Sequence, residues 1–424
     1  MRLRRFRAFG RTAALILVVA AVWPGAVAGQ APAFPDVLSA VSGRRAYEHV
    51  LALSQRIGPH VAGTPEDRTS GEYIARRLAD DGYAVEWQEF QFPFPVDRSA
   101  LDIPSSPSVA LHPHAMKYSP STAYEGITAE LADVGIGRPE DIRGKALAGK
   151  IALIQRGTIL FREKAKNAAD AGALAVLIYN FTPGDFFGLV SRDTKIPVAA
   201  LSGAEGLQLL DLVHSGSLRA HLIVQTTTER RTTWNIIGTK PGTRDPHRVL
   251  VVGAHRDTVE GAPGANDNTS GVATALEVAE VLRHTPLALT VRFVFFGAEE
   301  YGLYGGDYYV QHMGTDSVVG MVNLDMEGVG NRLQLAWYGG SDELVRLAAR
   351  IADRLGIAVV PARSEGSDHL SFERVGVPVV FLFRPDDQYY DTPKDTVDRV
   401  EPRLLEVSAR LATAIVLDVA GAGR

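Results

Sequence analysis

Residues 249–257, Val-Leu-Val-Val-Gly-Ala-His-Arg-Asp, combine a run of apolar side chains with polar ones directly after it. Such a short apolar run is typical of a buried strand. The same arrangement recurs at residues 289–300, which end in two glutamates, and at residues 321–325, which end in an aspartate. Because the ends of parallel strands meet at one edge of a sheet, we expect this edge to gather imidazole and carboxylate groups.

Strands and helices alternate regularly from Thr233 onward. The pattern predicts strands at residues 249–253, 289–296, 321–324 and 377–383, and helices at residues 270–284, 341–355 and 402–417. This alternation favours an α/β fold with a mostly parallel sheet that is covered by helices on both faces.

A smaller α/β unit is predicted to interrupt this pattern. It has expected strands at residues 150–155, 173–179 and 218–224 and a helix at residues 161–171. The prolines in front of it are predicted to break regular structure and to mark a boundary; they are Pro93, Pro95, Pro104 and Pro107. We therefore expect a discontinuous main domain, residues 35–98 and 228–424, with an inserted domain at residues 99–227.

The composition argues against nucleic-acid binding and against a metal site with cysteine ligands. With 44 basic and 49 acidic residues among 424, the chain has no excess positive charge for nucleic acid, and we expect none as a partner. The sequence contains no cysteine, so a metal site must be built from histidine and carboxylate groups.

The N-terminus has the pattern of a secretory signal peptide, residues 1–28. Several arginines precede an apolar run, residues 12–23, and Ala26-Val-Ala28 has the form of a cleavage site. A retained membrane anchor is the alternative, but the apolar run is shorter than the roughly 20 residues that a spanning helix needs. We predict a secreted or periplasmic protein with no membrane span after cleavage.

Two further segments supply candidate site residues. Asp267 lies in the loop 264–271, Gly-Ala-Asn-Asp-Asn-Thr-Ser-Gly, before a predicted helix. Its neighbours Asn268, Thr269 and Ser270 are ordinary turn and N-cap residues. The carboxylate of Asp267, however, has two oxygens and can bridge a pair of cations.

The pair Glu299-Glu300 follows a strongly apolar strand, where unpaired like charges are costly unless cations lie nearby. Neighbouring residues point in opposite directions, so one Glu can bind a metal while the other faces an attacking water. Asp325 ends its strand in the same way, and Asp257 is expected to support the ring of His255 through its second nitrogen. Histidine and carboxylates suit two divalent ions, zinc first, with manganese or cobalt as alternatives.

Together these motifs resemble those of the clan of co-catalytic two-zinc exopeptidases, which includes bacterial leucyl-type aminopeptidases and glutamate carboxypeptidases. The resemblance covers most of the chain outside the signal peptide. It implies that Asp267 bridges the two metals and that Glu299 is the general base. It also implies three further ligands: His255, Glu300 and Asp325.

The remaining ligand of that clan is the His of a Tyr-His-Thr motif, which in this chain reads Tyr390-Asp391-Thr392. We predict that Asp391 supplies the ligand oxygen; the alternative is one weak or empty metal position. Asp368 and His369, in another recurring segment, are predicted to surround the ligands or the substrate pocket. His369 has two other readings, a compensating ligand or a structural histidine. Tyr390 is predicted to lie near the ligands or in the substrate pocket, where it or a neighbour is expected to help stabilise the oxyanion.

The inserted unit also has a family likeness. Residues 149–157 and 161–172 resemble a protease-associated domain, which in such enzymes caps or flanks the peptidase domain. A gating role and a purely accessory role are both open.

We predict a metal-dependent aminopeptidase acting on peptides, whose metal-activated water attacks the first peptide bond while Glu299 transfers the proton. The alternatives are a carboxypeptidase, a glutaminyl cyclase with a single zinc, and a non-catalytic binding protein that has lost its metals.

Overall fold

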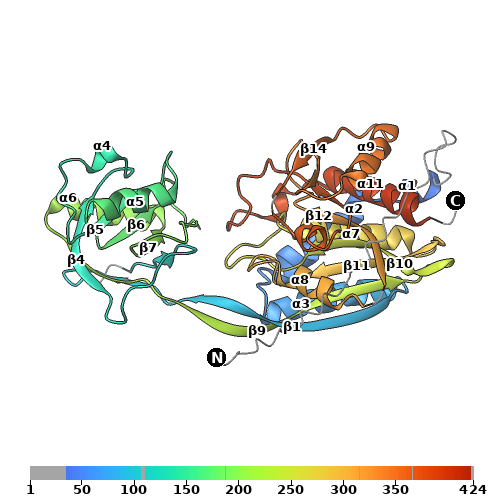
Figure 1. Cartoon of the computed structure of the whole chain (residues 1–424), viewed down its shortest axis with the longest axis horizontal. Helices are drawn as coiled ribbons and strands as arrows, with labels where there is room; N and C mark the ends of the chain where they lie inside the picture. The colour runs from blue at the N-terminus through green and yellow to red at the C-terminus, as the bar shows by residue number, and fades with distance from the viewer. Residues whose placement is uncertain (1–34, 107–109, 187, 315, 365, 422–424) are drawn as a thin grey trace, which may run out of the picture.

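The computed structural model describes residues 35–421 apart from 107–109, 187, 315 and 365. It has two units, each built on its own sheet. The long strands β1 (Ala84–Asp97) and β9 (Thr226–Lys240) pair as an antiparallel ribbon that runs between the units (Figure 1). The predicted signal peptide lies outside the described residues. Among those that are described, every helix is too short or too polar to cross a membrane.

The larger unit has, in its described part, an eight-stranded sheet of order β1-β9-β11-β10-β12-β15-β13-β14. Its four central strands, β11, β10, β12 and β15, are parallel, whereas β9 and β13 join them in antiparallel pairs. The remaining bounds are β10 Asp245–His255, β11 Leu289–Phe296, β12 Ser317–Asp325, β13 Gln334–Trp337, β14 Val360–Arg363 and β15 Val379–Phe383.

Helices cover both faces of this sheet. The side chains of α3, α7, α9 and α11 pack with one face, which includes Leu250 and Phe293, and those of α8 and α10 pack with the other, which includes Val251 and Phe296. The bounds are α1 Pro35–Ser39, α2 Gly43–Val50, the π-helix η1 Leu51–Ile57, α3 Pro65–Asp80, α7 Thr269–Leu282, α8 Tyr304–His312, α9 Glu343–Arg354, α10 His369–Glu373, the 3-10 helix η2 Val397–Arg399 and α11 Pro402–Ala420. The predicted α/β class with a parallel core is confirmed.

The smaller unit has a second sheet of order β2-β8-β4-β5-β6-β7-β3, with β4, β5, β6 and β7 parallel. Leu209 of α6 packs into the core on one face, and Ala165 and Ala168 of α5 pack into the core on the other. The bounds are β2 Ala100–Asp102, β3 His114–Ala115, β4 Ile127–Asp133, α4 Pro139–Ile142, β5 Ile151–Gln155, α5 Phe161–Asp170, β6 Ala175–Tyr179, β7 Val198–Leu201, α6 Gly203–Ser215 and β8 Arg219–Ile223.

The prediction that proline ends regular structure at residue 93 is wrong, because β1 continues through Pro93 and Pro95. β1 is the edge strand of its sheet, and its register pairs these prolines with Arg230 and Thr228 of β9. The two prolines are two positions apart, so both backbone nitrogens face the same side of the strand. An edge strand tolerates proline because one side needs no ladder hydrogen bond.

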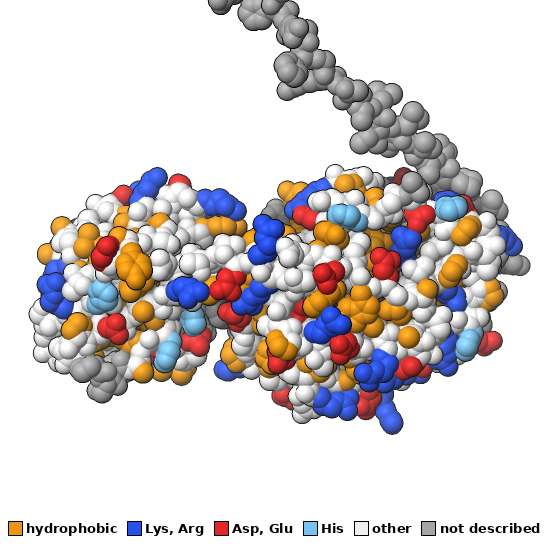
Figure 2. All heavy atoms as spheres, turned by 90° about the horizontal axis from the view of Figure 1, so that it is seen from below, with side chains coloured by type: hydrophobic (Ala, Val, Ile, Leu, Met, Phe, Trp, Pro, Cys, Tyr) orange, Lys and Arg blue, Asp and Glu red, His pale blue; other side chains and the backbone are white. Residues whose placement is uncertain are grey.

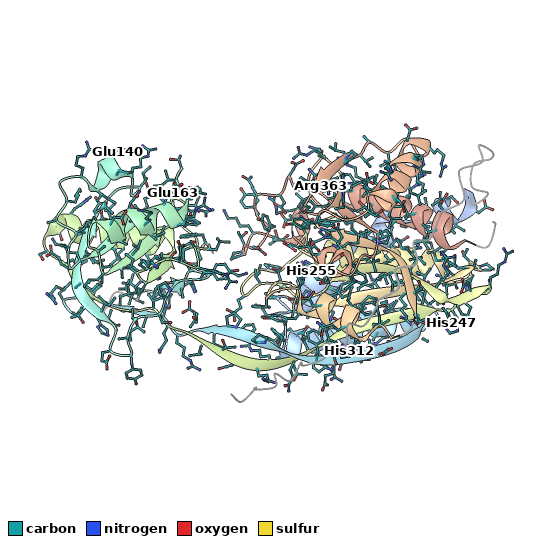
Figure 3. All side chains as sticks on the ribbon, in the orientation of Figure 1. Glu140, Glu163, His247, His255, His312 and Arg363 are labelled. Atoms are coloured by element: carbon teal, nitrogen blue, oxygen red, sulfur yellow. The ribbon has the colours of Figure 1, made fainter. Side chains whose placement is uncertain are left out.

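The parallel strands position the polar residues that follow them. β10 ends at His255 and β12 ends at Asp325, at the carboxyl edge of the sheet. Figure 3 shows that His255 lies on the side of the larger unit that faces the smaller one. The surface view shows a waist between the two lobes (Figure 2).

Candidate metal centre

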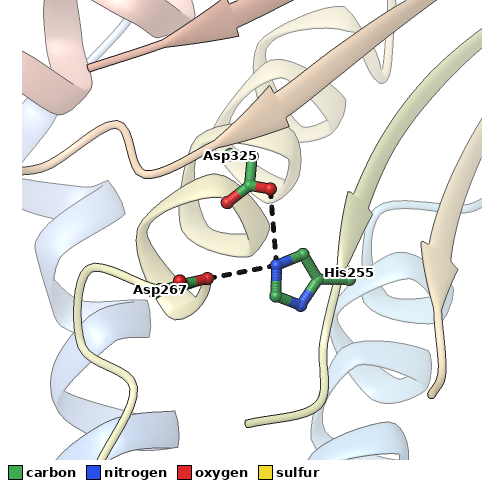
Figure 4. Close-up of side chains that lie close together, drawn as sticks. All are labelled: His255, Asp267 and Asp325. Carbon is green, nitrogen blue, oxygen red and sulfur yellow. Dashed lines mark ion pairs between the residues drawn. The ribbon is translucent and has the colours of Figure 1, made fainter. Parts of the chain in front are cut away.

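The centre begins with three side chains from three separate elements. His255 Nε2 lies 3.2 Å from Asp267 Oδ1 and 3.5 Å from Asp325 Oδ2 (Figure 4). His255 ends β10, Asp325 ends β12, and Asp267 lies in the loop before α7. An imidazole nitrogen and two carboxylates are a donor set that zinc uses in proteins.

Two more groups of donors overlap with this one. His255 lies with Glu299 and Glu300, and Asp267 lies with Glu300 and Asp391, each set having donor atoms within 4.8 Å of one another. The structure therefore brings together all six residues that the sequence predicted as ligands and base. His255, Asp267 and Glu300 each belong to two of the three groups, and a carboxylate in such a position can bridge two cations.

The electrostatics of these groups fit a cation. Burial raises the pKa of Asp267, and burial with the neighbouring charge of Asp391 raises the pKa of Glu300 well above its usual value. Burial also raises the pKa of Asp391 to about 7. Within the described residues, Glu300 Oε1, Asp325 Oδ1 and Asp391 Oδ1 are buried and have no hydrogen-bond partner. Because buried carboxylate oxygens without donors are costly, these atoms suit divalent metal ions.

His255 is surrounded by negative charge. Burial by itself lowers its pKa, but the charges of Asp325 and Glu299 outweigh this effect and raise the pKa well above the usual value. The second ring nitrogen, Nδ1, lies 3.1 Å from the backbone oxygen of Asp257 and 4.0 Å from its carboxylate. The expected support by Asp257 therefore comes from its main chain, because its carboxylate is turned toward another loop.

That loop carries the two glutamates. The carboxylate of Asp257 accepts the backbone N–H of Glu299 at 3.0 Å and that of Glu300 at 3.3 Å. Asp257 is fully buried, and burial raises its pKa to about 6. Asp257 thus fixes the direction in which the two glutamates leave the end of β11.

The loop of Asp267 is held by its neighbours. Asn268 is the N-cap of α7, since its side chain accepts the N–H of Gly271 at 3.0 Å, and its amide donates to the Leu324 carbonyl at 3.0 Å. The peptide bond between Asp267 and Asn268 is cis. As the sequence suggested, Asn268 is a cap, and it also joins this loop to the end of β12.

Three predicted surrounding residues take different positions. Asp368 is fully buried, and burial raises its pKa well above the usual value; its charge in turn raises the pKa of Glu299. His369 is outside the three donor groups found in the described residues. Its ring stacks on Phe381 with centroids 4.6 Å apart, and its Nε2 lies 3.3 Å from the backbone oxygen of Ser364; its role stays a prediction. Tyr390 is 47% exposed beside Asp391.

Several residues of the site were given no role by the sequence. The buried carboxylate of Asp395 accepts the N–H groups of Asn266 and Asp267 at 2.8 and 2.9 Å. Arg256, beside His255, forms a buried ion pair with Asp67 at 2.6 Å. Asp395 lies four positions after Asp391 in the same motif, so the sequence could have indicated that Asp395 belongs to the site. No local pattern in the sequence could have indicated that Arg256 pairs with Asp67.

A cavity of about 210 Å³ adjoins the candidate ligand Asp391. It is lined by two residues of the smaller unit, His114 and Asp185, and by residues of the larger unit: Glu260, Gly261, Asp391, Thr392 and Pro393. The smaller unit therefore contributes to the surroundings of the candidate centre.

Comparison with known proteins identifies the family of the chain. Residues 235–416 match peptidase family M28, and residues 119–209 match the PA domain. Aminopeptidase YwaD of Bacillus subtilis is 33% identical over 398 residues, which cover 88% of this chain and 84% of that protein. The chain belongs to peptidase family M28.

Other relatives of this M28 peptidase agree in sequence or in fold. A probable leucine aminopeptidase 2 of Aspergillus fumigatus is 33% identical, over 73% of this chain and 65% of that protein. The solved structure of BSAP, a zinc aminopeptidase from Bacillus subtilis, has 32% identity and a TM-score of 0.76, covering 91% of this chain and 96% of that one. An aminopeptidase from Aneurinibacillus sp. strain AM-1 has 33% identity and a TM-score of 0.66, covering 91% and 95%.

These comparisons confirm two predictions: the enzyme class, a metal-dependent aminopeptidase, and the presence of an inserted protease-associated domain.

Proposed function

We propose that this M28 peptidase removes N-terminal residues from peptides with two zinc ions. The observation that carries the proposal is that two groups of donors share the carboxylate of Asp267 and together contain all five proposed ligands. One ion would be held by His255, Asp267 and Asp325, and the other by Asp267, Glu300 and Asp391. The similar protein BSAP is a zinc aminopeptidase, which supports the choice of metal. Bound in pairs, such ions lower the pKa of a shared water and polarise a carbonyl group.

Glu299 is the proposed general base. Glu299 lies with His255 and Glu300 in one donor group. The other two groups, which share Asp267, can hold two ions without Glu299 as a ligand. Burial raises the pKa of Glu299 well above the usual value, which favours proton uptake by its carboxylate. Glu299 therefore accepts the proton of the attacking water and returns it to the leaving amine.

The peptide is proposed to reach the centre through the cavity between the two units. Asp185 and His114 of the smaller unit and Glu260 of the larger one line this cavity beside Asp391.

The proposed peptidase domain is discontinuous and consists of residues 35–98 and 228–424, with the inserted domain at residues 99–227 between its two parts. Secretion or periplasmic export by way of the N-terminal residues 1–28 is also part of the proposal.

Metal-reconstituted enzyme tests this function. We expect two zinc ions per chain and hydrolysis of peptides with a free N-terminal amine, with no cleavage after N-acetylation. Cleavage of N-blocked peptides at the C-terminus indicates a carboxypeptidase, and cyclisation of N-terminal glutamine with one zinc indicates a cyclase. Absence of both metal binding and turnover indicates a binding protein, and any of these three outcomes contradicts the proposal.

A further inference from the structure

Two loops that carry candidate ligands are each held by one buried carboxylate. Asp257 accepts two consecutive backbone N–H groups, those of Glu299 and Glu300. Asp395 accepts another consecutive pair, those of Asn266 and Asp267, at 2.8 and 2.9 Å. Both carboxylates are 0% exposed. Hydrogen bonds are stronger in the low dielectric of the protein interior than in water, so two bonds from consecutive N–H groups to one buried carboxyl fix the path of each loop.

Asp395 differs from Asp257 because its own loop also carries a candidate ligand. The backbone N–H of Asp395 donates to the backbone oxygen of Thr392, next to Asp391, at 3.0 Å. The backbone oxygen of Asp395 accepts the N–H of Ala265 at 3.3 Å. One short segment therefore presents Asp391 and at the same time holds the backbone from which Asp267 projects.

We propose that Asp395 is a positioning residue that sets the separation of Asp267 and Asp391, and thereby the affinity of the second cation position. This inference rests on the proposed two-metal function. Metal sites require donor distances correct to roughly 0.2 Å, so a small shift of one loop against the other weakens binding. Loss of a residue that orients a ligand typically lowers metal affinity by about 10–100-fold.

Two substitutions of Asp395 change either the number or the position of its acceptor oxygens. Asp395→Asn keeps the shape but replaces one acceptor with an NH₂ group that faces a backbone N–H. Asp395→Glu keeps both acceptors and moves them outward by one methylene. Asp387→Asn is the matched control, since Asp387 is also buried and accepts hydrogen bonds from the Asn266 side chain at 3.0 Å, the Tyr389 N–H at 2.8 Å and Arg399 at 3.3 Å, but from no N–H of a candidate ligand among the described residues.

The experiment is zinc titration of the chelated full-length protein against a competing chromogenic chelator, with cobalt spectra of the second equivalent. In Asp395→Asn we expect the second cation, which depends on the placement of both Asp267 and Asp391, to bind about 10–100-fold more weakly, and the first, which depends on Asp267 but not on Asp391, to weaken by a clearly smaller factor. Asp395→Glu should fall between this variant and the wild type. Asp387→Asn should keep both affinities, and thermal melting of each variant reports whether it is folded.

Unchanged binding of the second cation by folded Asp395→Asn overturns the inference, and so does equal weakening of both cations, which is the mark of a general scaffold residue. If Asp395→Asn fails to fold, the same criteria apply to Asp395→Glu. The wild-type protein is titrated first. If it binds a single zinc ion, the proposed two-metal function is wrong, and this outcome is distinct from a failure of the inference about Asp395.

Discussion

At the scale of single residues, the centre is a group of carboxylates whose burial is explained by cations. Glu300, Asp325 and Asp391 each bury an oxygen without a hydrogen-bond partner among the described residues. Burial also raises the pKa of Glu300 and Asp391, so in the metal-free protein their charged forms are disfavoured. Such an arrangement destabilises a fold unless divalent ions offset the charge, and this is the physical reason for proposing that these residues bind metal.

Replacing Glu299 with Gln tests the proposed base. The amide has nearly the same shape but does not accept a proton at neutral pH, so kcat should fall by about 10²–10⁴-fold. Zinc content should stay at two per chain, because Glu299 is not a proposed ligand. The measurements are steady-state kinetics on an aminoacyl substrate and metal analysis; a kcat within tenfold of the wild type excludes the base role.

Replacing Asp391 tests the ligand that departs from the Tyr-His-Thr motif. Asp391→Ala removes a donor from the second position and should weaken the second zinc by more than about tenfold. Asp391→His supplies a nitrogen donor and should restore binding toward the wild-type value. Chelator competition gives both affinities. If Asp391→Ala binds two zinc ions as tightly as the wild type, Asp391 is not a ligand.

At the scale of elements, a buried ion pair joins α3 to the end of β10. Arg256 Nη1 lies 2.6 Å from Asp67 Oδ1, and both side chains are 0% exposed. Arg256 follows His255 directly, so the same contact that fastens α3 also holds the strand end that presents the histidine. The hydroxyl of Thr233 donates to Asp67 at 2.8 Å and brings β9 into the same network.

Asp67→Ala leaves the guanidinium of Arg256 buried without its partner and should lower the unfolding free energy by about 3–5 kcal/mol. Urea unfolding followed by tryptophan fluorescence measures this, because Trp87, Trp234 and Trp337 lie in strands of the larger unit.

The control for this prediction is Glu72→Ala, which breaks an ion pair with Arg68 whose side chains are both 51% exposed. It should cost less than about 1 kcal/mol. Equal effects of Asp67→Ala and Glu72→Ala contradict the importance of the buried pair.

At the scale of the whole molecule, the two units are connected by the long ribbon of β1 and β9 and share the cavity beside Asp391 (Figure 1). The centre lies at the carboxyl edge of one sheet, so its charge affects the stability of the entire larger unit. Removing the metals therefore has a consequence that depends on pH.

In metal-free protein, burial raises the pKa of Asp391 and Asp395 to about 7, whereas ordinary carboxyls in the unfolded chain ionise near 4. Their stabilising contribution is fully present below about pH 4 and is lost as the pH rises from there through about 7. The part still to be lost above pH 6.5 should make chelated protein melt about 2–4 °C lower at pH 8 than at pH 6.5. Differential scanning calorimetry measures the shift.

Zinc-loaded protein is the comparison for this experiment and should lack the decrease, since the cations bind the ionised carboxylates. Burial lowers the pKa of His49 and His60 to about 4, so these histidines change their charge mainly below the pH range of the experiment, 6.5 to 8. A melting temperature of the chelated protein that stays constant or rises from pH 6.5 to 8 contradicts the prediction.

The sequence by itself predicted the order of strands and helices and the polar residues at the strand ends. It could do so because apolar runs and the polar side chains after them are local patterns. β11, for example, has the predicted bounds, Leu289–Phe296, and the six proposed ligand and base residues meet as expected. Two local rules failed for a tertiary reason. Proline did not end β1, because β1 lies at the edge of the sheet, and the carboxylate of Asp257 turned away from His255 to hold the loop of the glutamates.

Only the tertiary structure decided which distant groups meet. Asp395 bonds to Asp267 across 128 positions, and Asp67 pairs with Arg256 across 189. Buried polar groups must find partners wherever the folded chain brings them, so such pairs carry no signature in the neighbouring sequence.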